Sequence, residues 1–167
     1  PSGILVPGRQ SVIGNGVVVS PAAFRDEVRG LERRGVRVRG RLRLSLSAHV
    51  ILSSHVMLDS LREERGRGIG TTRRGIGPCY EDKVARIGVR VCDYLDPPVF
   101  RRLVDQNLRV RRSEIASGAL PPAKVREEVF RGYEALRRFL APFACDTGAF
   151  LNRELDRGRR VLFESAQ

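Results

Sequence analysis

A glycine-dense loop holds the residues whose types and spacing could do chemistry. Residues 66–79 read Gly-Arg-Gly-Ile-Gly-Thr-Thr-Arg-Arg-Gly-Ile-Gly-Pro-Cys. Glycine lets backbone amides approach an anion closely, threonine hydroxyls add directed donors, and guanidinium gives a charged fork that suits phosphate. It is no Walker loop, because the chain contains no Gly-Lys-Ser or Gly-Lys-Thr, and it does not follow a strand as a dinucleotide fingerprint must. Its composition is compatible with a phosphate-binding loop and also with a basic surface loop.

A short helix is predicted over residues 80–87, directly after this loop. Val84 and Ile87 would mark an apolar stripe on it. Lys83, Arg86 and Arg90 follow the spacing i, i+3 and i+7. On a helix, this spacing would place their side chains on one face as a basic stripe. Such a surface would dock against a protein while presenting cations to a phosphate. A solvated basic face is the alternative.

The chain is strongly basic. Its 167 residues carry 31 Lys and Arg against 19 Asp and Glu, a formal net charge of +12, and every cation except Lys83 and Lys124 is an arginine. Such charge suggests a nucleic-acid-binding module. The arginines are spread along the chain, however, tryptophan is absent, and the ten Tyr and Phe do not sit among the arginine clusters. Because a nucleic-acid surface concentrates charge and interleaves aromatic residues, we expect no nucleic-acid partner and keep this module as the alternative.

Neither the cysteines nor the histidines have the spacing of a metal site. Cys79, Cys92 and Cys145 are 13 and 53 residues apart, which fits no zinc motif and no paired disulfide framework, so reduced thiols are expected. The two histidines, His49 and His55, are expected to cap or to pack. Since no apolar run approaches the roughly 20 residues of a membrane-spanning helix, no membrane partner is expected.

The elements that must position the loop follow from hydrophobic periodicity. Short apolar strands alternate with amphipathic helices, which predicts an α/β fold with a mostly parallel sheet and flanking helices. Capping residues at Ser20-Pro21, Asp96-Pro97 and Asp146 mark helix starts. Strict alternation over residues 36–46 predicts a strand or a pair of strands. Strands are expected at about 11–14, 17–19, 36–46 and 161–163, and helices at about 21–34, 51–65, 80–87, 96–108, 121–140 and 146–157.

Five sequence blocks together are more specific than any one of them. They are Pro1-Ser-Gly-Ile-Leu, Ile13-Gly-Asn-Gly-Val-Val-Val, Gly70-Thr-Thr-Arg-Arg-Gly-Ile-Gly-Pro, Tyr80-Glu-Asp-Lys-Val-Ala-Arg and Val161-Leu-Phe-Glu-Ser-Ala-Gln. In order and spacing these blocks resemble the adenylosuccinate synthetase family, and the resemblance covers essentially the whole chain. It implies a nucleotide-binding, P-loop-related α/β fold that is incomplete here. Residues 1–167 would be a single partial domain, the central part of a longer chain, without its N- and C-terminal segments.

The resemblance also implies an activity. Members of the family are GTP-dependent ligases that join IMP and L-aspartate into adenylosuccinate, with GDP and phosphate, in de novo AMP biosynthesis. They are cytoplasmic homodimers. The family's phosphate loop, general-base aspartate, catalytic histidine and Mg²⁺ ligands would precede Pro1, and neither His49 nor His55 matches that histidine. We therefore expect no catalytic and no metal-binding residue in this chain, with GTP and Mg²⁺ bound outside it, and no activity of the chain alone.

The family's motifs imply roles for individual residues. Thr72 would donate to the 5′-phosphate of IMP in its own subunit, and Arg86 would reach the IMP bound by the partner subunit. Gln167 would contact the same nucleotide. Arg74 would lie in a loop near the substrates. The residues expected at the dimer interface are Lys83, Arg86 and Arg90.

Two residues depart from the family pattern. Arg73 stands where the family has glycine, and Ser165 replaces the glycine of Glu-Gly-Ala-Gln. If position 73 needs a positive φ, arginine there costs about 1 kcal/mol or more. These departures motivate a further alternative, a non-catalytic paralogue that keeps the nucleotide and dimer contacts.

Overall fold

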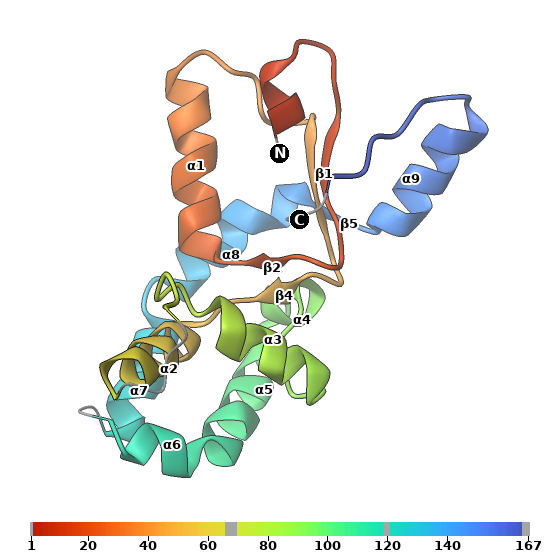
Figure 1. The fold of residues 1–167 in the computed structure, drawn as a ribbon. Coiled ribbons are helices and arrows are strands. Elements are labelled where there is room, and N and C mark those ends of the chain that lie inside the picture. The colour runs from red at the N-terminus through yellow and green to blue at the C-terminus, as the bar shows by residue number, and fades with distance from the viewer. Residues whose placement is uncertain (1, 66–69, 119–120, 165–167) are drawn as a thin grey trace.

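The computed structural model describes residues 2–65, 70–118 and 121–164. Three parallel strands, β1 (Ser11–Ile13), β3 (Leu42–Ser45) and β5 (Ala144–Cys145), form a sheet in the order β1-β3-β5, and β2 (Val18–Val19) pairs in parallel with β4 (His49–Val50). In Figure 1, α1 (Pro21–Arg33) and α8 (Tyr133–Leu140) lie on one side of the three-stranded sheet and α9 (Thr147–Asp156) lies on the other. The predicted α/β fold with a parallel sheet and flanking helices is confirmed, although the sheet is small and helices dominate.

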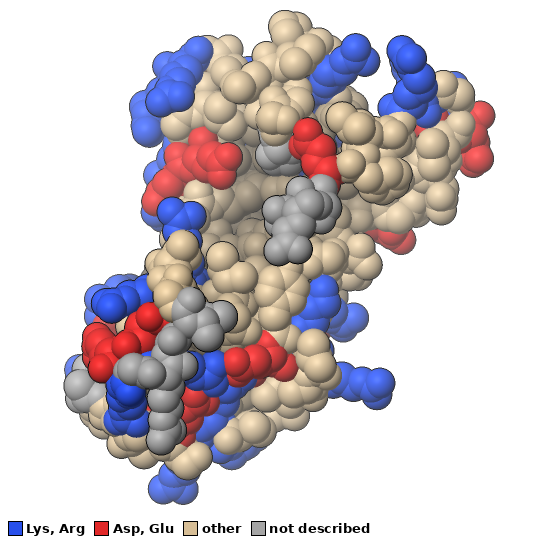
Figure 2. All heavy atoms as spheres, viewed as in Figure 1, with Lys and Arg blue, Asp and Glu red and all other residues tan. Residues whose placement is uncertain are grey.

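A second group of helices gathers below the β2–β4 pair (Figure 1). It comprises α2 (Ser53–Glu64), α3 (Ile76–Val84), α4 (Val91–Leu95), α5 (Pro97–Val110), α6 (Arg112–Ala116) and α7 (Pro122–Phe130). An aromatic cluster joins this group to the start of α8: the rings of Phe100 and Tyr133 stack with centroids 4.3 Å apart, and the Tyr133 hydroxyl donates to the Tyr94 carbonyl oxygen at 2.8 Å. Figure 2 shows basic and acidic side chains interleaved on the visible face of this group. None of the helices in the described ranges is long and apolar enough to cross a membrane.

Three predicted helix starts are confirmed by side-chain caps. The Ser20 hydroxyl and the carboxylates of Asp96 and Asp146 each accept a hydrogen bond from the backbone amide three residues later, at 3.4, 3.2 and 3.0 Å. Pro21 and Pro97 follow two of these caps. Their missing N–H costs nothing there, because the first amides of a helix have no partner within it.

The strand predicted over residues 36–46 is wrong in its first half. β3 begins only at Leu42, and residues 36–41 form a loop. The Arg41 guanidinium holds this loop by donating to the backbone carbonyl oxygens of Ile4 and Arg9. Val38 is fully buried within the loop. The alternation therefore reflects burial rather than strand pairing.

The long helix predicted over residues 121–140 is two helices, α7 and α8. Gly132 separates them with a φ of +68°, a left-handed conformation that glycine adopts readily. The periodicity runs through the break because both helices bury apolar residues in the same core, among them Val125, Val129 and Leu140.

The strand predicted over residues 161–163 is also wrong. Residues 159–164 form neither helix nor strand, and the side chains of Leu162 and Phe163 are 82% and 77% exposed. A short strand is stable only when its backbone pairs with a neighbour. The strands of the two described sheets pair with one another and not with this segment.

The backbone of α2 lies directly against Gly75, the residue before α3. Its φ is +74°, and a Cβ there would lie 2.7 Å from the Val56 nitrogen and 2.8 Å from the His55 carbonyl carbon. Gly132 has a similar φ of +68°, but a Cβ there would meet nothing within 4 Å. Comparing substitutions at the two glycines therefore distinguishes the cost of a left-handed backbone from the cost of a collision with α2.

We predict that Gly75→Ala destabilises the protein far more than Gly132→Ala. The second substitution should cost about 1–2 kcal/mol, the penalty of a left-handed alanine. Gly75→Ala adds a collision with the α2 backbone, which cannot move aside, and should cost about 2 kcal/mol more. Urea unfolding of both variants measures the difference. Equal losses would contradict the close packing of α2 on α3.

Candidate functional site

Of the candidate phosphate loop predicted over residues 66–79, residues 70–75 are described as loop and lead into α3, which begins earlier than predicted. The helix spans Ile76–Val84 rather than residues 80–87. Gly75 precedes it in the left-handed conformation, and Pro78 lies within its first turn, where a missing N–H leaves no hydrogen bond unmade. The loop therefore opens directly onto the N-terminal, positive end of the α3 macrodipole, which favours an anion.

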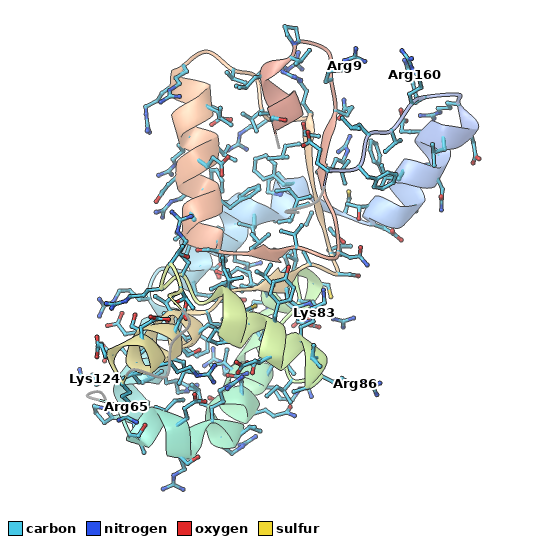
Figure 3. The ribbon with its side chains drawn as sticks, in the orientation of Figure 1. Arg9, Arg65, Lys83, Arg86, Lys124 and Arg160 are labelled. Atoms are coloured by element: carbon cyan, nitrogen blue, oxygen red, sulfur yellow. The ribbon has the colours of Figure 1, made fainter. Side chains whose placement is uncertain are left out.

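The basic stripe predicted for Lys83, Arg86 and Arg90 is wrong, because the three residues do not share a helix. α3 ends at Val84, Arg86 has a φ of +60°, and Arg90 is the N-cap residue of α4. Lys83 Nζ donates at 3.2 Å to a backbone carbonyl oxygen in the β1–β2 turn, and Arg90 Nε pairs with Asp93 at 3.0 Å. Arg86 is exposed, and Figure 3 shows its side chain pointing away from the body of the molecule.

α3 has an apolar stripe, but not through the residues predicted. Ile87 lies beyond the helix, so it cannot continue a stripe from Val84. Ile76, Tyr80 and Val84 instead follow the spacing i, i+4, i+8, and they are 42%, 39% and 81% exposed. This face of α3 is an apolar surface open to solvent.

α2 holds the loop from beneath through one carboxylate. Asp59 is 4% exposed; its Oδ1 accepts a hydrogen bond from the Thr71 hydroxyl at 2.9 Å and its Oδ2 accepts one from the Gly75 amide at 2.8 Å. With Thr71 turned toward α2, the side chains of Thr72 and Arg74 are exposed. The structure thus distinguishes two adjacent threonines: the Thr71 hydroxyl is bonded to α2, whereas Thr72, like Arg74, is exposed.

Arg73 has the positive φ that its place in the pattern suggested, +53°. Left-handed backbone at a residue with a Cβ costs about 1 kcal/mol. The Arg73 amide donates to the Thr71 hydroxyl at 3.2 Å, and the Thr71 amide donates to Glu63 at 2.9 Å. These bonds offset part of the strain, so the arginine is accommodated in the loop.

Sequence reasoning singled out His55 but missed Asp59 and Glu63, the residues of α2 that bond the loop. His55, Asp59 and Glu63 follow the spacing i, i+4, i+8, and all three form hydrogen bonds to α3 or to the loop. Such a polar stripe on a helix flanked by apolar residues is the signal that could have identified them. Such a stripe indicates that the polar face of the helix packs against another part of the protein and not against solvent.

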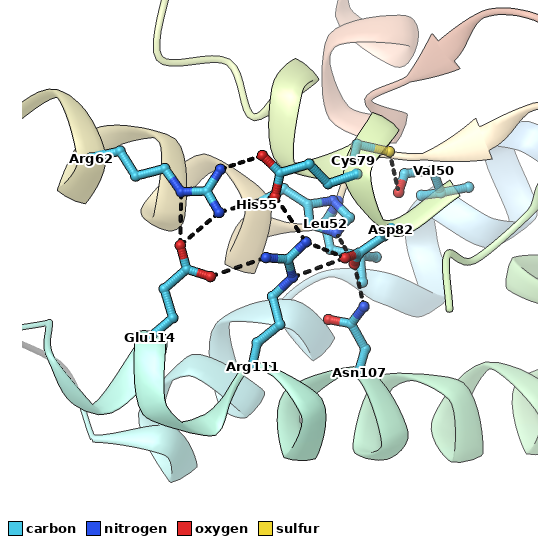
Figure 4. Close-up of polar contacts among 10 residues, drawn as sticks. Val50, Leu52, His55, Arg62, Cys79, Asp82, Asn107, Arg111 and Glu114 are labelled. Carbon is cyan, nitrogen blue, oxygen red and sulfur yellow. Dashed lines mark hydrogen bonds and ion pairs between the residues drawn. The ribbon is translucent and has the colours of Figure 1, made fainter. Parts of the chain in front are cut away.

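A buried carboxylate on α3 joins the surrounding helices (Figure 4). Asp82 is 0% exposed and accepts hydrogen bonds from His55 Nε2 at 2.9 Å, from Arg111 Nε at 2.8 Å and from Asn107 Nδ2. His55 Nδ1 accepts from the Leu52 amide at 3.0 Å, so Nε2 is the ring nitrogen that donates to Asp82. The capping role expected for His55 is confirmed.

These donors decide the charge of Asp82. Burial raises the pKa of its carboxyl group, because it disfavours the charged form. The hydrogen bonds from His55, Asn107 and Arg111 act in the opposite direction and outweigh burial, so the pKa lies below its usual value of 3.8. Asp82 is therefore a charged group at neutral pH.

A ring of ion pairs lies beside Asp82 (Figure 4). Arg62 and Arg111 each contact both Glu81 and Glu114: Arg62 Nε lies 2.7 Å from Glu114, while Arg111 lies 3.0 Å from Glu114 and 3.2 Å from Glu81. The hydrogen bond from Arg62 is the main cause of a lowered pKa of Glu81. The ring ties α2 and α3 to α6.

We predict that Asp82→Asn strongly destabilises the fold at neutral pH. The change removes the most buried partner of Arg111 and turns an amide N–H toward other donors, at a cost of about 3 kcal/mol. Because the pKa of Asp82 is lowered on folding, its contribution is present above the ordinary pKa of 3.8 and is lost as the pH falls through the folded value. The stability gap between the variant and the native chain should therefore narrow below that pH.

Urea unfolding at neutral pH and at a series of acid pH values checks this prediction. Asp105→Asn is the matched control, because Asp105 and its partner Arg126 are 38% and 42% exposed and such a surface pair contributes less than about 1 kcal/mol. A gap that stays constant into acid would contradict the assignment of a charged Asp82.

Some predicted site residues lie outside the described part of the chain. These are Gln167 and Ser165, together with Gly66 and Gly68 of the loop. Arg86 lies beyond the far end of α3 from the loop. Within residues 2–65, 70–118 and 121–164, no group of three or more His, Cys, Asp or Glu is arranged to hold a metal ion.

Known proteins resemble this chain along its whole length. A model of the adenylosuccinate synthetase family matches residues 1–167. The adenylosuccinate synthetases of Endomicrobium trichonymphae and Geobacillus kaustophilus are 42% and 45% identical to it over 167 and 169 residues, covering 100% of this chain and 39% of each relative. The fully ligated adenylosuccinate synthetase from Plasmodium falciparum superposes with a TM-score of 0.78 at 27% identity, over 96% of this chain and 37% of that one.

The match covers all of this chain but only part of each relative. The chain spans about two fifths of the length of the curated relatives it matches. Sequence blocks, parallel sheet and loop geometry all lie within the matched region. Because the family model covers every residue, the chain belongs to the adenylosuccinate synthetase family.

Proposed function

We propose that a polypeptide of the relatives' full length that carries this segment is a GTP-dependent ligase. It would join IMP and L-aspartate into adenylosuccinate, with GDP and phosphate, in AMP biosynthesis in the cytoplasm. The observation that carries the proposal is the loop at residues 70–75, which is bonded to α2, runs into the N-terminus of α3 and has Thr72 and Arg74 exposed. This geometry supports binding of a phosphate group in a chain that belongs to the family throughout.

Thr72 and Arg74 are the proposed contacts to IMP within the subunit. A threonine hydroxyl donates one directed hydrogen bond to a phosphate oxygen, and an arginine adds a charged fork. Neighbouring Arg73 adds positive charge, and the α3 macrodipole favours the same dianion. Gln167 is the proposed third contact, and it lies outside the described residues.

The proposed partner is a second copy of the chain. The apolar face of Ile76, Tyr80 and Val84 on α3 is the kind of surface that association covers. Arg86 lies just beyond this face and is exposed, so a subunit docked on α3 would bring its nucleotide within reach of Arg86. Lys83 and Arg90 would line the same interface.

GTP and Mg²⁺ would bind outside this chain. The described residues offer no cluster of three or more metal-binding side chains, and the relatives are more than twice as long as the chain. We therefore propose that the chain contributes IMP-phosphate and dimer contacts, and that the chain alone is inactive. When bound, Mg²⁺ would neutralise the phosphate charge of GTP during phosphoryl transfer.

The first test is product formation by the full-length polypeptide. We predict that adenylosuccinate forms from IMP, GTP and aspartate, and that Thr72→Val raises the KM for IMP about 10–100-fold, because a hydrogen bond to a charged group is lost. Thr72→Ser keeps the hydroxyl and should remain close to the native value. Chromatographic detection of adenylosuccinate measures both quantities. A dimeric full-length preparation that forms no product would refute the ligase proposal.

A second test separates contacts within a subunit from contacts across the interface. If Thr72 acts in its own subunit and Arg86 in the partner's site, a heterodimer of Thr72→Val and Arg86→Leu subunits contains one site with both native residues. Mixing the two weak variants should then restore roughly one quarter of native activity, since about half of the randomly formed dimers are mixed. Activity that stays at the level of the separate variants would place both residues in one subunit's site.

A further inference from the structure

We propose that Asp59 is a positioning residue, whose buried carboxylate holds residues 71–75 in the conformation that presents Thr72 to the nucleotide phosphate. The inference rests on the proposed function, because it concerns the group that prepares the same site. Asp59 itself is 4% exposed, and both of its carboxylate oxygens are bonded to the loop. It would act on IMP only through the loop.

The contacts of Asp59 close the loop at both ends. One carboxylate oxygen accepts from the Thr71 hydroxyl and the other from the Gly75 amide, at 2.9 and 2.8 Å. A carboxylate is an acceptor without donors, so it satisfies two donors at once. An amide of the same shape has a single acceptor oxygen and would leave one of them unsatisfied.

The effect of Asp59 passes on to Arg73. Since the Thr71 hydroxyl donates its hydrogen bond to Asp59, its oxygen lone pairs remain to accept from the Arg73 amide, at 3.2 Å. That bond supports the left-handed Arg73, with its φ of +53°. The chain of hydrogen bonds therefore links a buried carboxylate on α2 to the turn that lies between Thr72 and Arg74.

The surroundings of Asp59 favour positioning over direct binding. A carboxylate open to the loop surface would repel a phosphate. Here both of its oxygens accept hydrogen bonds and the group is buried, while Arg73 and Arg74 of the loop are exposed. At the other end, the His55–Asp82 contact holds α3 against α2. The Asp59 contacts therefore set the conformation of the loop between two helices that are already fixed.

The experiment uses the full-length polypeptide with Asp59→Asn, Thr71→Val and the double variant. Asp59→Asn should raise the KM for IMP about tenfold, the equivalent of one hydrogen bond, with kcat and the KM for GTP changed less than about threefold. Thr71→Val should have a smaller effect in the Asp59→Asn background than in the native one, because the hydroxyl has already lost its acceptor. Thr71→Ser, which keeps the hydroxyl, and Asp105→Asn, a surface carboxylate, are the controls.

Trypsin cleavage does not depend on enzymatic activity, so it tests the role of Asp59 separately from the ligase proposal. Trypsin cleaves after arginine, and cleavage of the folded protein after Arg73 and Arg74 reports how often the loop opens. Asp59→Asn should accelerate this cleavage about tenfold, while cleavage after Arg131, between α7 and α8, stays unchanged and serves as the internal reference. IMP should slow cleavage at the loop in the native protein.

Each outcome has a consequence for the proposal. Faster cleavage at the loop together with a raised KM for IMP supports it. Unchanged cleavage, or faster cleavage with an unchanged KM for IMP, overturns it. If the native polypeptide forms no adenylosuccinate, the ligase proposal fails, and cleavage still decides whether Asp59 holds the loop. If Asp59→Asn does not fold, Thr71→Val tests the same contact from the loop side.

Discussion

The buried carboxylate of Asp82 is the constraint on which the helical part of the structure depends. A carboxylate out of reach of water is stable only when donors surround it. Its donors come from His55 on α2, Asn107 on α5 and Arg111 just before α6, so these helices can pack on α3 only where their donors converge. This arrangement leaves one polar atom unsatisfied. Asn107 turns Nδ2 to Asp82, and its Oδ1 is buried without a hydrogen-bond partner among the described residues.

The same arrangement determines where charge resides. The Leu52 amide donates to Nδ1 of His55, so the ring presents Nε2 to Asp82 as a donor. Two arginines, Arg62 and Arg111, then face three carboxylates in the cluster, and the excess is negative. The excess negative charge is tolerated because Glu81 is 48% exposed and solvated, whereas the fully buried Asp82 is surrounded by donors. Solvent access thus separates two adjacent acidic residues on one helix.

For the site, the consequence is that α3 holds the loop and Arg86 at a set separation. Asp59 fixes Gly75 before the first residue of α3, and Asp82 fixes the helix near its last turn. Nine helical residues rise about 13 Å, which separates the loop from the residues next to Arg86. Because both ends of the helix are bonded to its neighbours, a change in the loop cannot be absorbed by sliding α3.

How much of this could be predicted depends on whether the deciding interaction is local in sequence. Ser20, Asp96 and Asp146 cap amides three residues away, and these helix starts were predicted. The strand predicted over residues 36–46 and the basic stripe were wrong because Arg41 bonds a segment more than 30 residues distant and because α3 ends before Arg86.

Asp59 presents the same difficulty within the site. Helical spacing reveals a polar stripe, but its hydrogen-bond partners lie 12 and 16 residues further along, across a turn whose shape depends on those very bonds. Thr71 and Thr72 are adjacent and of the same type, so no local sequence pattern tells their roles apart. Only the carboxylate beneath Thr71 distinguishes them, by turning one hydroxyl inward and leaving the other exposed.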